Sequence, residues 1–121
     1  PVEEQHRHDR LGMTAKRLDD AIASLDRATQ WILANLARNP DSALAGATHY
    51  LRMFANAAGG CMLAEEAVAA SRSGNGAGNA PDRIAIARFF AETIAVQSPS
   101  LELAVTESAD AVTSATLPGA A

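Results

Sequence analysis

The sequence contains few aromatic side chains, one cysteine and no long uncharged apolar run. Aromatic residues make up 4% of the 121 residues, whereas hydrophobic residues as a whole make up 48%. Much of that apolar content is alanine, the best helix former, and β-branched residues are sparse, so the composition favours helices over sheet. A chain of this length and apolar content can bury one core, which argues against intrinsic disorder.

Other scarcities narrow the class of protein further. The single cysteine, Cys61, excludes an intramolecular disulfide and fits a reducing cytosol, so we expect a cytoplasmic protein. The longest uncharged run, between Arg52 and Glu65, is shorter than the roughly 20 residues that a membrane-spanning helix requires. The formal net charge of −4, without a dense Lys/Arg cluster, disfavours binding to nucleic acid. We therefore expect no membrane and no nucleic acid among the partners.

Four segments show helical spacing of their apolar residues. The predicted helices cover residues 11–38, 42–72, 82–97 and 99–114. Pro40 ends the first helix, the Gly/Asn/Ser-rich stretch SRSGNGAGNAPD separates the second from the third, and Pro99 opens the fourth. The expected N-caps are Asp41 or Ser42, and Ser98. The pattern predicts an all-α, up-and-down four-helix bundle over 11–115, between a flexible segment 1–10 and a frayed tail 116–121.

The apolar spacing also predicts which helix faces are buried. On the first helix the expected inner face comprises Leu11, Ala15, Leu18, Ile22, Leu25, Thr29, Ile32 and Leu36. On the second it comprises Leu44, Ala47, Leu51, Phe54, Ala58, Cys61 and Val68. Each of the adjacent glycines Gly59 and Gly60 costs a helix about 1 kcal/mol relative to alanine. We therefore predict that Gly59 and Gly60, with Ala58 and Cys61, let a neighbouring helix pack closely.

The few large aromatic side chains are the best candidates for contact with another protein, because aromatic residues are enriched at binding hot spots. The candidate interface residues are Trp31, Phe54, Phe89 and Phe90. For Trp31, a position at the edge of the core is an equally good interpretation. For the Phe89–Phe90 pair, we expect one ring to point inward and the other to be partly exposed or buried in a partner.

No motif predicts catalysis, cofactor binding or metal binding by this chain's own residues. His6 and His8 could ligate a metal, but a polar terminal segment explains them more simply. Cys61 lies on the apolar face with no base nearby, which favours a small core residue over a nucleophile. His49 lies about four helical turns from Glu65, too far for an acid–base pair on one helix.

Two stretches resemble a known family. YLRMFANAAGGCMLAEEAVAA, which begins at Tyr50, and ARFFAETIAVQSPSLELAVTESADAV, which begins at Ala87, are similar to the C-terminal extension of a bacterial group of acyl-CoA dehydrogenases. In that group a glycine-containing helix ends in alanines and is followed by an Arg-Phe-Tyr/Phe helix, a proline break and an alanine-rich last helix. Two details depart from the pattern: Cys61 stands where the family usually has tryptophan, and VQSP replaces a Leu-Pro step.

The resemblance implies a role outside the catalytic centre. Such dehydrogenases hold FAD non-covalently and oxidise an acyl-CoA thioester to its 2,3-enoyl form, with a glutamate base and the flavin as hydride acceptor. Those sites belong to domains that precede the extension, so no catalytic or cofactor-binding residue is carried over to this chain. The resemblance implies an accessory domain that packs on the catalytic domains or on another subunit and is inactive alone.

Other functions stay open at this stage. A free-standing helical module could bind one amphipathic helix of a partner. A ligand-binding bundle would need a pocket with convergent polar groups, and the sequence does not identify those groups. The chain does not begin with methionine, which fits either a piece of a longer polypeptide or removal of the initiator methionine before Pro1. Apolar surface meant for missing domains could then be covered in a homodimer.

Overall fold

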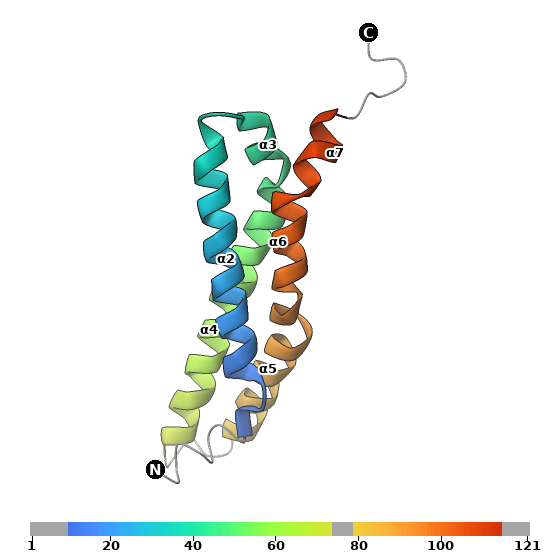
Figure 1. The fold of residues 1–121 in the computed structure, drawn as a ribbon. Coiled ribbons are helices and arrows are strands. Elements are labelled where there is room, and N and C mark those ends of the chain that lie inside the picture. Colours follow the sequence, from blue (N-terminus) through green and yellow to red (C-terminus); the bar gives the residue numbers. More distant parts are fainter. Residues whose placement is uncertain (1–9, 74–78, 115–121) are drawn as a thin grey trace.

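The computed structural model describes residues 10–73 and 79–114, which form helices joined by short turns (Figure 1). The elements are α2 Thr14–Leu36, α3 Pro40–Ala45, α4 Ala47–Arg72, α5 Ala80–Thr93, the 3-10 turn η1 Ala95–Gln97, α6 Ser98–Thr106 and α7 Ser108–Ser114. No strand occurs in this described part, so the all-α prediction is confirmed. Residues 1–9, the centre of SRSGNGAGNAPD and the predicted tail lie outside the described residues, as do His6 and His8.

The helices stand in three columns (Figure 1). The chain ascends through α2, turns through α3, descends through α4 and ascends again through α5, η1, α6 and α7. α2 packs on α4 and α6, and α4 packs on both α5 and α6. The four predicted helical segments are therefore helical, but the third and fourth are stacked end to end rather than side by side. The short η1 turn and Pro99, in the first turn of α6, keep the chain ascending.

The connections differ from the sequence prediction. The predicted helix 42–72 is divided at Gly46 into α3 and α4, and the last segment is divided at Glu107. Gly46 is buried, and a Cβ atom there would lie 3.1 Å from Val105 Cα, so this corner rests directly on α6. The expected caps are also absent, since neither α3 nor α6 begins with a side-chain cap. The Ser98 hydroxyl is instead buried without a hydrogen-bond partner among the described residues.

Most of the buried apolar residues are alanines, so the columns lie close together. Alanine contributes Ala21, Ala28, Ala43, Ala57, Ala67, Ala80, Ala87, Ala91, Ala95 and Ala109 to the core. The largest fully buried side chains are Met53 and Val105, which form one cluster with Ala28. A second cluster surrounds Leu18 and a third surrounds Ile84.

The buried face of α4 is turned away from the predicted one, whereas the buried side of the first helix agrees with the prediction in part, since Leu11, Leu25 and Ile32 pack against the core clusters. The buried residues of α4 are Met53, Ala57, Gly60 and Ala67, whereas Leu51, Phe54 and Ala58 are exposed. On α2, Leu18 is buried as expected, but Ile22 and Leu36 are exposed. The inner positions carry the smaller residues because closely packed helices gain more contacts from small side chains than from bulky ones that hold them apart. Several large apolar side chains are therefore left on the surface.

Candidate interaction surface

Two other helices pack directly against Gly60 of α4. A Cβ atom placed on this buried glycine would lie 2.5 Å from Leu18 Cδ2 of α2 and 3.4 Å from Phe90 Cδ1 of α5. The neighbouring Gly59 differs, because a Cβ atom there would meet Phe90 Cζ at an ordinary contact distance of 3.5 Å. Gly60 thus lies where three helices meet, and Gly59 lies at the edge of that junction.

The other two residues of the predicted packing set, Cys61 and Ala58, differ in burial. Cys61 is half-buried and packs against the cluster around Leu18. Burial raises the pKa of its thiol, and the negative charges of Glu65 and Asp19 raise it further. Ala58 is exposed, which corrects the prediction that it faces a neighbouring helix.

The structure divides the four candidate interface aromatics into two inner and two outer rings. Trp31 is half-buried beside Met53, and Phe90 is half-buried over the two glycines. Phe54 is 54% exposed and Phe89 is 66% exposed. Phe54 and Phe89 therefore have rings that a partner could cover, on α4 and α5 respectively.

An apolar row lies on the outer side of α4, next to α2. Its members recur at intervals of three and four residues, so they share one side of the helix. The row consists of Leu51, Phe54, Ala58 and Met62, all exposed. Two residues of α4 that face α2 lie next to this row. Tyr50 lies four residues before Phe54, and Cys61 lies three residues after Ala58, so the row borders the contact with α2.

A second apolar row lies on α2, facing α4. Ile22, Leu25, Thr29 and Leu33 recur at intervals of three and four, and the Thr29 hydroxyl lies 2.8 Å from the Tyr50 hydroxyl of α4. Ile22 is 48% exposed and Leu33 is 65% exposed. The two rows border one strip of surface, which we term the α2–α4 groove. Half-buried Leu25 and Cys61 lie at its floor, where both pack against the same core cluster.

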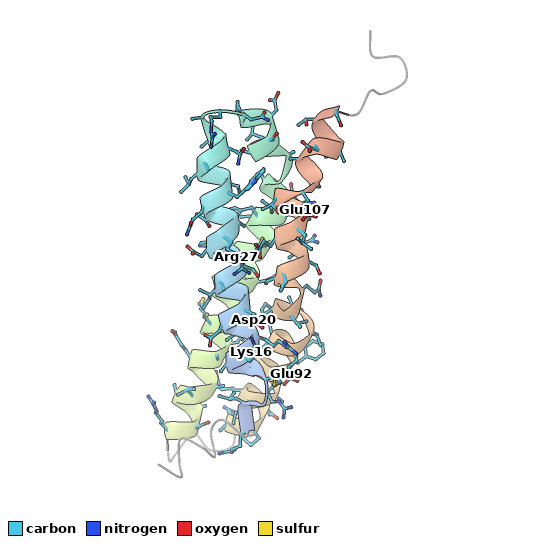
Figure 2. The ribbon with its side chains drawn as sticks, in the orientation of Figure 1. Lys16, Asp20, Arg27, Glu92 and Glu107 are labelled. Carbon is cyan, nitrogen blue, oxygen red and sulfur yellow. The ribbon has the colours of Figure 1, made fainter. Side chains whose placement is uncertain are left out.

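A different side of α2 is polar and is tied to α6. Arg27 donates from Nε and Nη2 to the two carboxylate oxygens of Glu102, both at 2.9 Å. These hydrogen bonds lower the pKa of Glu102, although partial burial opposes them. Further down the same helix, Lys16 Nζ donates to Asp20 Oδ1 at 2.7 Å (Figure 2).

Gly12, which the sequence analysis did not identify, fixes the start of α2. Its φ of 55° lies in the left-handed region that favours glycine. The backbone N–H of the next residue, Met13, donates to Glu92 Oε1 of α5 at 3.1 Å. Gly12 lies inside the predicted helix 11–38, and its poor helix propensity was the available signal that the helix begins later, at Thr14. Its contact with α5 could be found only from the tertiary structure.

The described residues show no metal or membrane feature. They contain no group of three or more His, Cys, Asp or Glu side chains arranged to hold a metal ion. Across residues 10–73 and 79–114, no helix has the length and apolar character needed to cross a membrane.

Comparison with known proteins gives a family for this arrangement of helices. The family model described as acetyl-CoA dehydrogenase C-terminal like matches residues 2–116. Neither a curated protein nor a solved structure matches the chain. The family match includes all the helices described above and both stretches that carry the resemblance in the sequence. The chain therefore belongs to the acetyl-CoA dehydrogenase C-terminal-like family.

Proposed function

We propose that this chain is the accessory C-terminal helical domain of a flavin-dependent acyl-CoA dehydrogenase of the cytoplasm. The observation that carries the proposal is the family match over residues 2–116. In the parent enzyme, FAD and a glutamate base bound in the preceding domains would perform the 2,3-dehydrogenation of an acyl-CoA thioester. This chain would pack against those domains or another subunit and would be catalytically inert alone.

The surface of the chain supports a packing role. Closely packed alanine-rich columns form a firm scaffold, because their inner positions leave little space for rearrangement. Large apolar side chains such as Phe54, Met62 and Phe89 are each more than half exposed. Phe54 and Met62 belong to one row on α4, and an exposed apolar row of this kind is typical of surfaces that another protein covers.

An activity assay on two samples tests this proposal. The first sample is the native polypeptide purified from its source, and the second is the 121-residue chain, checked by circular dichroism for helical structure. We expect the native polypeptide to oxidise acyl-CoA substrates with an artificial electron acceptor and the chain alone to show no turnover. Turnover by the chain alone would contradict an accessory role, and a native polypeptide without flavin or turnover would contradict the dehydrogenase.

A second candidate function is a free-standing helical module that binds a helix of a partner protein. The α2–α4 groove favours it, since a strip of exposed apolar residues between two helices suits an amphipathic helix. The two functions differ in what the native polypeptide contains, because only the first requires flavin-binding domains on the same chain.

A further inference from the structure

Carboxylates continue the apolar rows of the α2–α4 groove. Asp19 and Asp26 lie three residues before and four residues after Ile22 on α2. Glu65 lies three residues after Met62 on α4. Residues at these intervals are neighbours on a helix surface, and all three carboxylates are exposed. Each helix therefore presents negative charge beside its exposed apolar side chains.

The Cys61 thiol at the floor of the groove also indicates that carboxylates of both helices lie along the groove. Cys61 is half-buried between the helices, and the charges of Glu65 on α4 and Asp19 on α2 both raise its pKa. One carboxylate from each helix therefore lies close enough to Cys61 to affect the charge state of its thiol.

The groove carboxylates have no cationic partner among the described residues. The ion pairs in the described part of the chain use other acidic residues, namely Asp20, Glu66, Glu92 and Glu102. Asp26 accepts a hydrogen bond from the Gln30 amide, which is neutral. The negative charge along the groove is therefore left for an outside cation.

At the end of the groove near the C-terminus of α4 there is a hollow. It has a volume of about 400 Å³ and is lined by Ala64, Glu65, Val68, Ala69 and Arg72. Its aliphatic walls can accept the side chain of a leucine or methionine from a partner, and Glu65 places one groove carboxylate at its edge. Arg72 adds a positive charge at this end, so a partner's acidic residue would fit only there.

We propose that the α2–α4 groove receives one amphipathic helix whose apolar side is flanked by Lys or Arg, contributed by the catalytic part of the same dehydrogenase. The apolar side packs on Phe54 and Met62, and the flanking cations pair with Asp19 and Glu65. The source of this helix rests on the proposed function, whereas the chemistry of the groove does not.

A second copy of this chain fits the groove less well. Two-fold pairing of identical grooves would bring the carboxylates of one copy against those of the other. Like charges held together across an interface oppose association, whereas opposite charges set its orientation and partner choice.

Two designed peptides test the chemistry of the groove. Both are helical, carry the same leucine row and a fluorescent label, and differ only in flanking lysines or flanking glutamates. Titration of each with the 121-residue chain, followed by fluorescence anisotropy, should show at least about fivefold tighter binding of the lysine peptide. The difference should shrink in 0.5 M salt. Equal binding, no binding, or dimerisation of the chain in place of binding would overturn the proposal.

Variants then locate the binding site. Phe54→Ser should weaken the binding of the lysine peptide about tenfold, because the substitution removes a large apolar contact. The matched control Phe89→Ser removes a somewhat more exposed ring on α5 and should leave binding unchanged. The double variant Asp19→Lys with Glu65→Lys should reverse the preference between the two peptides. Equal losses from Phe54→Ser and Phe89→Ser would overturn the assignment to this groove.

Thiol labelling tests the source of the helix separately. If the catalytic part covers the groove, Cys61 should react with a maleimide more slowly in the native flavoprotein than in the 121-residue chain. Equal rates would overturn that source while leaving the peptide results in place. A native polypeptide without flavin would instead contradict the proposed function, whatever the peptides show.

Discussion

Gly60 and Leu18 lie against each other where α4 packs on α2, with no space for a side chain on the glycine. A Cβ atom at Gly60 would lie 2.5 Å from Leu18 Cδ2, closer than non-bonded carbon atoms approach. Because Leu18 is itself buried, its terminal methyl can move only by disturbing the surrounding core. This contact explains why a helix interior tolerates a residue with poor helix propensity.

Alanine at the two adjacent glycines should have different effects. Gly59→Ala should stabilise the fold by up to about 1 kcal/mol, because it restores helix propensity where its Cβ makes an ordinary contact. Gly60→Ala gains the same propensity but overpacks the junction, so it should be about 1–3 kcal/mol less stable than Gly59→Ala. Urea unfolding followed by circular dichroism measures both variants. Equal stability of the two would show that the helices do not approach as closely as described.

Truncating a buried methionine should cost far more than truncating an exposed one. Met53 is fully buried beside Val105, so Met53→Ala should lower the free energy of unfolding by about 2–4 kcal/mol. Met62 lies on the same helix but is 69% exposed, so Met62→Ala should change stability by less than about 0.5 kcal/mol. Thermal or urea unfolding of both variants compares them directly. A large loss for Met62→Ala would indicate that the inner face of α4 has been misassigned.

The ion pair between α2 and α6 should contribute to stability at neutral pH and lose its contribution in acid. The hydrogen bonds from Arg27 lower the pKa of Glu102 from its ordinary value of 4.5. The stabilisation is therefore present above about that pH and is lost as the pH falls through the lower pKa of the folded state. An NMR titration of the Glu102 carboxyl should show this lowered pKa, and Arg27→Gln should raise it. An unchanged Glu102 titration in Arg27→Gln would rule out the pair in solution.

The Cys61 thiol should react slowly at neutral pH. Because burial and the carboxylates of Glu65 and Asp19 raise its pKa above the ordinary value of 9.0, little thiolate is present at pH 7. The rate of modification by a disulfide reagent should rise with pH, and Glu65→Gln should shift that profile to lower pH. Glu66→Gln serves as the control, because Glu66 pairs with Arg83 of α5 rather than acting on the thiol. Identical profiles for the two variants would refute the role of Glu65.

The helical class could be predicted from the sequence because alanine content and apolar spacing are local properties. The arrangement of the columns could not be predicted from the sequence. Whether the chain reverses direction at Ser98 or continues in the same direction depends on tertiary packing. Ser98 followed by proline is a standard helix start, yet its hydroxyl caps nothing and is buried without a hydrogen-bond partner among the described residues. Cap propensity describes an isolated helix end, whereas the buried junction is governed by which residues fit between α2, α4 and α6.

The inner face of α4 shows a similar limit. A hydrophobicity pattern selects Leu51 and Phe54 because they are the largest apolar residues, but the structure buries Ala57 and Gly60. In an alanine-rich bundle the size of a side chain decides how closely helices pack, and periodicity alone does not distinguish size from hydrophobicity. The α2–α4 groove could not be predicted for the same reason, because the pattern assigns several of its residues, among them Ile22, Leu51 and Phe54, to the core.

The most direct test of the proposed function is the mass of the native polypeptide, measured together with the flavin absorbance of the same purified fraction. We expect a yellow polypeptide several times larger than 12.6 kDa, with this chain as its C-terminal part. A colourless native product near 12.6 kDa would contradict the dehydrogenase and leave a small protein that binds a partner helix.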